Sequence, residues 1–439
     1  MKSNNLNFHN LIPGGCHTYS KGDDQFSSNA PRYLVGGKGS YCTDGTKEFL
    51  DCGMGLASIT LGHGFEEVND AVVETIKSGT NFMRPSLLEF QTAEMFLEMI
   101  PHHSMIKFAK NGSTTTTAAV KLARAHTNRK LIAVPTDHPF YSYDDWFIGS
   151  TNANFGVPSE IKSLTVGYKS CSIESLKELF EKHGQQIAAV ISEPEKNWCS
   201  NCNCGATPEM FLKSAIDLCE ENGALFILDE MQSGYRLAFP GAMSKYNLKP
   251  HLTTWGKGIA NGFSFCALTG IREVMELGGI RNIGARKLFL ISTTNGAESV
   301  GLAAAIATNK IYKKHNVLDH QHMIGRRIIE VMTLVIAKYN MNNYLDVYPC
   351  NWMPGLRFND IDDEYKADYL KTFVIQEMIN NGILFQGVFV PSYSHTLTDV
   401  GIFSIGFENT VKKIADWIAD KRGEGVIGDL VKPVFRKYI

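Results

Sequence analysis

The middle of the chain alternates short apolar runs with amphipathic stretches, a pattern that predicts strands and helices in turn. Four runs of nearly continuous apolar character stand out, at 131–135, 187–194, 224–230 and 265–271. Strands of this kind are usually buried on both faces, because helices cover both sides of a parallel sheet. The pattern therefore predicts an α/β domain with a mostly parallel sheet.

A capped helix is predicted between the second and third of these runs. Thr207 and Pro208 form a typical helix start, apolar residues follow at helical spacing, and Gly223 marks the end. In sheets of this kind, ligands bind at the carboxyl ends of the strands. The residues directly after each apolar run are therefore the first candidates for a functional site.

The two ends of the chain have a different pattern. Residues 1–60 are punctuated by glycines and alternate strand-like runs with turns, whereas the predicted large domain covers 61–310. From 311 to 439, two helical patterns alternate with two strand-like runs, which predicts a smaller α+β domain. The helices are expected at 328–339 and 368–382, and the strands at 344–349 and 401–407.

Composition and charge exclude several classes of protein. The hydrophobic fraction of 44% and the charged fraction of 20% are ordinary for a globular protein, and the net charge of −2 favours no nucleic-acid or membrane partner. No stretch has the length and apolar purity of a transmembrane helix, and the polar start MKSNNLNFHN does not resemble a signal peptide. We therefore expect a cytoplasmic protein.

Three of the ten cysteines lie close together, at Cys199, Cys202 and Cys204. A CxxC pair can bind zinc, but a structural zinc site needs a fourth ligand, and no second CxxC or HxxxH motif follows. We therefore interpret this segment as a loop of reduced thiols and expect no metal. A zinc protein built on this loop is the remote alternative.

Four segments at strand ends or helix starts carry candidate chemistry. The first, 111–115, opens a helix, where backbone N–H groups and the helix dipole suit a phosphate, although helix capping alone explains it better. The second begins with Asp229 after the apolar run ALFIL, where a buried carboxylate needs a positive partner. A protonated pyridine nitrogen is such a partner, and an ordinary ion pair or helix cap is the alternative.

The third segment places Lys257 between Gly256 and Gly258, which leaves the amine open to an aldehyde. In a dry pocket the pKa of a lysine falls, and the amine becomes a better nucleophile. The fourth segment, 292–296, is a second hydroxyl-rich helix start. Glycine-flanked lysines also occur in plain surface turns, so this segment alone decides nothing. The order of the four segments along the chain favours a phosphate-bearing pyridine aldehyde as the ligand.

The sequence resembles the class III (ω-type) aminotransferases of pyridoxal phosphate fold type I, and within them the glutamate-1-semialdehyde 2,1-aminomutase branch. The similarity runs from about residue 11 to the C-terminus. The motifs that carry it are IPGG (12–15), LGHG (61–64), NGST (111–114), KLARAHTNRK (121–130), SEP (192–194), ILDEMQSGYR (227–236), WGKGIANG (255–262) and STTNGAESVGLAAA (292–305). The resemblance implies an α/β fold with a seven-stranded, mostly parallel sheet, a smaller α+β domain from the two chain ends, and pyridoxal 5′-phosphate (PLP) as cofactor.

The resemblance also implies roles for individual residues. Lys257 matches the lysine that forms a Schiff base with PLP and carries a proton, and Asp229 matches the partner of the pyridine nitrogen. The other matched positions lie at the phosphate (Gly112, Ser113), the ring face (Phe140), the phenolic oxygen (Gln232), the substrate (Glu193) and the phosphate of the neighbouring subunit (Thr293). The last of these implies a homodimer with shared active sites.

Departures from the family pattern fall on substrate-facing positions. Thr114 stands where the aminomutases carry glutamate, and Tyr141 follows Phe140 where they carry histidine. Lys21 replaces an arginine expected to hold the substrate carboxylate, and lysine lacks the bidentate fork of arginine. Together with Tyr19, Lys21 gives this segment the hydrogen-bonding capacity for a hydroxylated substrate.

The sequence therefore predicts an aminotransferase that takes an amino group from L-glutamate, through pyridoxamine phosphate, to a hydroxylated or sugar-like aldehyde or ketone. A true glutamate-1-semialdehyde 2,1-aminomutase is the alternative, against which Lys21 and Thr114 argue. A PLP-binding protein without catalysis is disfavoured because Lys257 and Asp229 are both present.

Overall fold

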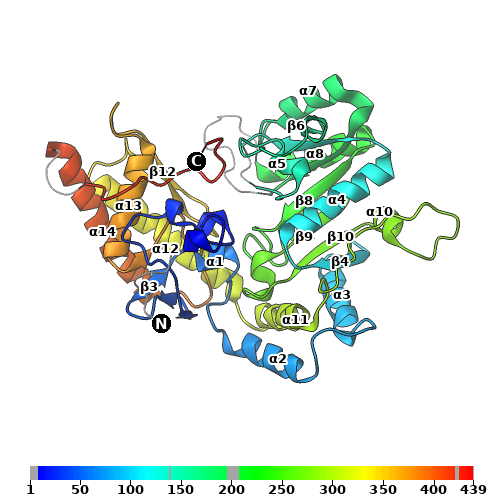
Figure 1. Cartoon of the computed structure of the whole chain (residues 1–439), viewed down its shortest axis with the longest axis horizontal. Coiled ribbons are helices and arrows are strands. Elements are labelled where there is room, and N and C mark those ends of the chain that lie inside the picture. The colour runs from blue at the N-terminus through cyan, green and yellow to red at the C-terminus, as the bar shows by residue number, and fades with distance from the viewer. Residues whose placement is uncertain (1–7, 138–139, 195–206, 421–424, 439) are drawn as a thin grey trace. The chain divides into compact units, whose positions relative to one another are not determined.

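The computed structural model describes residues 8–137, 140–194, 207–420 and 425–438. The chain divides into two compact units, which are both drawn in Figure 1. The large unit comprises Ala57–Thr60 and Glu66–Leu318, and the small unit comprises Met1–Leu56, Leu61–Phe65 and Asp319–Ile439. Within the described ranges, none of the helices combines the length and hydropathy that a membrane crossing requires.

A seven-stranded sheet forms the centre of the large unit, in the order β4-β10-β9-β8-β7-β5-β6. Among the described strands of this sheet, β10 alone runs antiparallel to its neighbours. The predicted mostly parallel sheet is thereby confirmed. The strands are β4 (Met105–Ala109), β5 (Leu131–Pro135), β6 (Thr165–Tyr168), β7 (Ile187–Ser192), β8 (Leu225–Glu230), β9 (Leu252–Trp255) and β10 (Cys266–Gly270).

The four predicted apolar runs correspond to β5, β7, β8 and β10, and each of these strands is buried along its whole length. Continuous apolar character therefore had the expected cause, since both faces of the sheet are covered. Strand β9 is equally buried but was not among the predicted runs. Its sequence LTTW contains Thr253 and Thr254, both fully buried, which hide the apolar signal.

Helices cover the sheet of the large unit (Figure 1), and α4 packs against strands β4, β7, β8, β9 and β10. The predicted capped helix is α8, where the Thr207 hydroxyl accepts a hydrogen bond from the Met210 N–H at 3.2 Å. The helices before α12 are α1 (Met54–Ala57), α2 (Glu66–Lys77), α3 (Leu87–Met99), α4 (Gly112–Thr127), α5 (Asp145–Ile148), α6 (Ser159–Lys162), α7 (Ile173–His183), α8 (Pro208–Glu221), α9 (Ala242–Tyr246), α10 (Arg272–Met275) and α11 (Ser299–Lys314).

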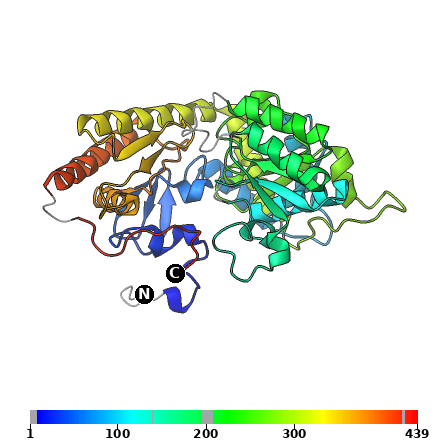
Figure 2. The same ribbon diagram turned by 90° about the horizontal axis from the view of Figure 1, so that it is seen from above.

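The small unit is an α+β structure built from both chain ends, as predicted. A four-stranded sheet has the order β1-β2-β3-β13, in which the C-terminal strand β13 pairs in parallel with the N-terminal strand β3. Its strands are β1 (Gly36–Lys38), β2 (Tyr41–Thr43), β3 (Glu48–Asp51) and β13 (Ile383–Leu384), and a separate pair is formed by β11 (Leu345–Tyr348) and β12 (Gly355–Phe358). The long helices, yellow to red in Figure 2, are α12 (Val317–Lys338), α13 (Ala367–Asn380) and α14 (Leu397–Asp420).

The predicted strand at 401–407 is wrong, because this segment lies inside helix α14. Phe403 and Phe407 are one helical turn apart and both are fully buried in the core of the small unit. Ile405, which a strand would place on the same face as these two, is 67% exposed. The apolar positions therefore follow the helical period rather than the alternation of a strand.

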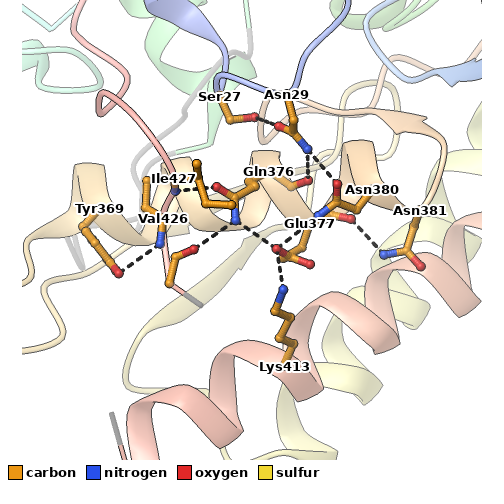
Figure 3. Close-up of polar contacts among 11 residues, drawn as sticks. Ser27, Asn29, Tyr369, Gln376, Glu377, Asn380, Asn381, Lys413, Val426 and Ile427 are labelled. Carbon is orange, nitrogen blue, oxygen red and sulfur yellow. Dashed lines mark hydrogen bonds and ion pairs between the residues drawn. The ribbon is translucent and has the colours of Figure 1, made fainter. Parts of the chain in front are cut away.

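A polar network attaches the terminal segments of the small unit to α13 (Figure 3). The Asn29 side chain donates to the Gln376 carbonyl at 2.9 Å, and the Ile427 N–H donates to the Gln376 side chain at 2.8 Å. Beside them, the Lys413 ammonium lies 3.0 Å from the buried carboxylate of Glu377. These contacts fix both chain ends in one unit, and we assign them a structural role.

Candidate active site

Asp229 lies at the carboxyl end of β8 and Lys257 just beyond the neighbouring parallel strand β9, so both lie at the same edge of the sheet. Asp229 is the next-to-last residue of β8, pairs with Thr254 of β9 and is 2% exposed. One of its carboxylate oxygens accepts hydrogen bonds from the Thr254 hydroxyl at 2.8 Å and from the Met231 N–H at 2.9 Å. The carboxylate is therefore buried and held in a fixed orientation by these two donors.

Lys257 opens a short 3-10 turn, Lys257–Ala260, directly after β9. Its φ of 51° is left-handed, a conformation that costs a residue with a side chain roughly 1–2 kcal/mol and is frequent at functional sites. The preceding Gly256 has no room for a side chain, since a Cβ atom would collide with Met231 and lie 2.7 Å from the Cys266 sulfur. Close packing therefore holds the backbone that presents the lysine.

The start of α4 lies against the same methionine. A Cβ atom on Gly112 would lie 3.0 Å from the Met231 side chain, so Met231 separates the helix start from the lysine turn. The side chain of Asn111 accepts from the Thr114 N–H at 2.9 Å and is the helix cap. The amide groups of the first turn, including Gly112 and Ser113, point out of the helix end and can bind an anion.

Gln232 and Phe140, two further predicted site residues, follow strands β8 and β5 of the large unit. The buried side-chain oxygen of Gln232 has no hydrogen-bond partner within the part of the chain that the structure describes. The oxygen and nitrogen of an amide are assigned from their partners, so this side chain can accept from or donate to a bound group. Phe140 is 45% exposed and packs edge-on against Phe147, with 6.1 Å between ring centres.

Glu193 directly follows β7 and is 9% exposed. Its N–H donates to the hydroxyl of Tyr141 at 3.2 Å. Burial raises the pKa of Tyr141 far above its usual range, with further contributions from Tyr168, Glu193 and Asp229. The Tyr141 hydroxyl is therefore neutral and anchors the backbone that carries Glu193.

Sequence reasoning noted Tyr141 only as a departure and missed Met231 and Thr254 as parts of the site. Met231 contacts both Gly112 and Gly256, and Thr254 orients Asp229. Their positions gave a usable signal, since each lies within three residues of a predicted site residue. Their roles depend on packing across three strands, which the sequence does not display.

Thr293 lies apart from these residues. Together with Thr294 it lines a cavity of about 570 Å³ whose described lining also includes Phe82 and Met83. None of the other predicted site residues is among the described residues of that lining. Glu298, not a hydroxyl of the 292–296 segment, caps α11, so capping does not account for these threonines.

Tyr19 and Lys21 form a 3-10 turn in the small unit, and both side chains are exposed. Lys21 lines a cavity of about 720 Å³ with Arg32 and Lys432, and with the carboxylates of neighbouring aspartates. Cys199, Cys202 and Cys204 lie outside the described residues. Within the residues that the structure describes, no group of three histidine, cysteine or acidic side chains could hold a metal ion.

Comparisons with known proteins identify the family of the chain. The model of the family described as aminotransferase class-III matches residues 25–386. The glutamate-1-semialdehyde 2,1-aminomutase of Clostridium beijerinckii is 30% identical over 425 residues, covering 90% of this chain and 94% of the relative. The enzyme of the same name from Francisella philomiragia is 31% identical over 391 residues, covering 85% and 88% of the two chains.

Among solved structures, the FumI protein of Sphingopyxis sp. MTA144, in its PLP internal aldimine form, has the same fold. The TM-score is 0.83 at 23% identity, over 94% of this chain and 96% of that one. The predicted fold class is thereby confirmed, and the match to the aminotransferase class-III family confirms the predicted cofactor. The family model spans most of the chain, and the chain therefore belongs to the class-III aminotransferases, PLP-dependent enzymes of fold type I.

Proposed function

We propose that the chain transfers an amino group from L-glutamate to a hydroxylated, sugar-like aldehyde or ketone, with Lys257 as the lysine that holds PLP. The convergence of three turns on Met231 carries this proposal. These turns bring together a helix start for a phosphate, a buried carboxylate and a lysine on glycine-flanked backbone. The three parts of the cluster match the three groups of PLP: the helix start suits the anionic phosphate, the carboxylate the basic ring nitrogen, and the lysine amine the aldehyde.

The residues of the large unit fit the cofactor group by group. Gly112 and Ser113 would hold the phosphate, Asp229 the ring nitrogen, and Gln232, whose side-chain oxygen lacks a described partner, the phenolic oxygen. Phe140 would stack on the ring. When bound, PLP supplies an electron sink that stabilises the negative charge formed at the substrate carbon when its proton leaves.

The protein residues supply the proton transfers and the orientation. The Lys257 amine would remove the proton from the donor Cα and return a proton to the acceptor carbon. Asp229 would hold the ring nitrogen in its protonated form, because a buried carboxylate favours a positive partner. Glu193, whose backbone the Tyr141 hydroxyl anchors at 3.2 Å, would contact the substrate.

The substrate class rests on the N-terminal turn of the small unit. Lys21 offers a point charge with three rotatable donors, which suits several oxygen acceptors better than one bidentate carboxylate. Tyr19 adds an exposed hydroxyl, at 63% exposure, to the same turn. This capacity supports a polyhydroxylated acceptor over a simple keto acid.

A glutamate-1-semialdehyde 2,1-aminomutase is the second candidate. The names of the relatives that are about 30% identical support it. A mutase needs no external donor, because it returns the amine that it removes. Lys21 and Thr114 depart from the aminomutase pattern at the substrate carboxylate and the phosphate loop, and they favour the aminotransferase.

The first half-reaction tests the donor. On mixing PLP-loaded enzyme with L-glutamate, we expect the visible absorbance band to bleach and one equivalent of 2-oxoglutarate to appear per site. D-glutamate is the matched control and should leave the band unchanged, because the proton-transfer geometry is specific for one face. A band that L-glutamate leaves intact but glutamate-1-semialdehyde bleaches would instead establish the aminomutase.

We also propose a homodimer in which Thr293 reaches the phosphate in the other subunit. Exposed apolar side chains beside the Thr293 cavity support this, since Phe82 is 52% and Met83 101% exposed. Sedimentation should show a dimer, and Met83→Glu should yield monomers with weakened PLP binding. Phe155→Glu, at a residue equally exposed but outside that lining, should remain dimeric. A monomeric wild-type enzyme with full activity would contradict the proposal.

A further inference from the structure

The side chain of Arg236 is fully buried, with 1% of its surface exposed. Burial lowers the pKa of its guanidinium to about 10. Arginine is seldom buried, because removing its charge from water costs more than its packing contributes unless its donors are used. A buried arginine three residues after the loop residue Ser233 and close to the cofactor residues therefore requires a physical explanation.

The guanidinium of Arg236 contacts three separate segments. One nitrogen donates to the carbonyl of Ala57, and the other donates to the carbonyl of Gln232 at 3.3 Å. The same group lies against Gly258, where a Cβ atom would be 2.8 Å and 2.9 Å from its two terminal nitrogens. Arg236 thus joins the 57–60 segment, a proposed cofactor residue and the turn that starts with the proposed PLP lysine.

The segments that Arg236 joins have strained backbones. Lys257 and Asn261, at the two ends of the lysine turn, have φ of 51° and 44°, and Ala57 has φ of 62°. The N–H of Thr60 also donates to the Asn261 side chain at 3.0 Å, so the two segments are attached at a second point. Left-handed residues persist only where their surroundings hold them, and the guanidinium packs against Gly258, the residue next to the lysine.

We propose that Arg236 is a positioning residue that holds the turn of Lys257 in register with Gln232, and so sets the orientation of the bound cofactor. This inference rests on the proposed role of Lys257 and goes beyond it. The planar fork suits the task because its donors point in fixed directions to the two carbonyls while its face packs on Gly258. Lysine keeps the charge but cannot make both contacts at once.

The loop that carries Arg236 has other supports, so a substitution should leave it folded. The carboxylate of Glu230 accepts from the Ala242 N–H, which closes the loop at its base. The Tyr312 hydroxyl donates to the Tyr235 carbonyl at 2.8 Å, and the two rings pack with centres 5.0 Å apart. These contacts do not involve the guanidinium.

The test compares Arg236→Lys and Arg236→Met with Arg129→Lys in PLP-saturated enzyme. Arg129 is a matched control, because its guanidinium also donates to two carbonyls, those of Ile187 at 3.2 Å and Asn222 at 2.7 Å. It does so at the amino end of the sheet, away from Lys257. The readouts are the visible circular dichroism of bound PLP and the kinetics with L-glutamate.

Both Arg236 variants should lose most of the induced dichroism at full cofactor occupancy. Their kcat should fall about 100-fold, the effect of a misplacement of about 1 Å, whereas KM changes far less. Arg129→Lys should keep both signals. The dichroism needs no substrate, so its outcome does not depend on the proposed donor.

A second variant tests the contact with Gly258 independently. Gly258→Ala should push the guanidinium away and reduce the dichroism, and Arg236→Lys should relieve this clash. The dichroism lost in the double variant should therefore be smaller than the sum of the losses in Gly258→Ala and Arg236→Lys. Unchanged dichroism in Arg236→Met, or strictly additive losses in the double variant, would overturn the positioning role while leaving the proposed function intact.

Discussion

Replacement of Lys257 with alanine is expected to abolish turnover, by at least about 10⁴-fold, because one change removes both the cofactor attachment and the proton carrier. The side chain projects from a turn whose backbone is fixed by glycine packing on both sides. Alanine tolerates this backbone no worse than lysine does. The variant should therefore fold and bind PLP without the visible band of the lysine-bound form.

Single-turnover mixing with L-glutamate measures this loss, with Lys213→Ala as the control. Lys213 lies on α8 and pairs with Glu209 at 2.6 Å, and it is half-exposed. Its loss should leave turnover unchanged. Partial recovery of the Lys257→Ala variant by added methylamine would support the role of the amine as a proton carrier. Near-normal turnover without any amine would exclude Lys257 as the PLP lysine.

Asp229→Asn should retain PLP but lower kcat by about 100- to 1000-fold, the size expected when one buried electrostatic partner is lost. Asparagine has nearly the same shape and can still accept from the Thr254 hydroxyl and the Met231 N–H. It cannot stabilise a positive ring nitrogen. The ring should then withdraw electrons less strongly, and proton removal from the donor should become slower.

The primary deuterium isotope effect with 2-deutero-L-glutamate measures this step and should rise in Asp229→Asn. Asp399→Asn is a matched control, since Asp399 is also a buried carboxylate, with donors that include Tyr41 at 2.6 Å and Thr396 at 2.8 Å. It belongs to the small unit and should change stability without changing the isotope effect. An unchanged kcat in Asp229→Asn would contradict the role of Asp229.

The sequence predicted the sheet of the large unit and the residues at its edge. Fully buried strands leave long apolar runs, and the carboxyl ends of parallel strands share one edge, so Asp229 and Lys257 could be placed together. The resemblance to a known family added the roles of Gly112, Gln232 and Thr293. These roles stay proposals, because they depend on a bound cofactor and on a second subunit.

Contacts between distant segments could not be predicted. Nothing near Arg236 in the sequence indicates that its guanidinium meets Ala57 and Gly258, because these contacts depend on how loops pack. Strand β9 was not predicted, because its two buried threonines interrupt the apolar pattern in the sequence. The segment 401–407 resembles a strand locally because isoleucine and phenylalanine are common in strands, whereas its burial follows the helical period.

Reductive trapping tests the central claim most directly, namely that Lys257 holds PLP at the edge of the sheet. PLP-loaded enzyme is treated with borohydride, digested and mapped by mass spectrometry. We predict that the phosphopyridoxyl group is found on the peptide that contains Lys257, at about one group per chain. A label on another lysine, such as Lys110, or no label on an enzyme that transaminates L-glutamate, would contradict the account.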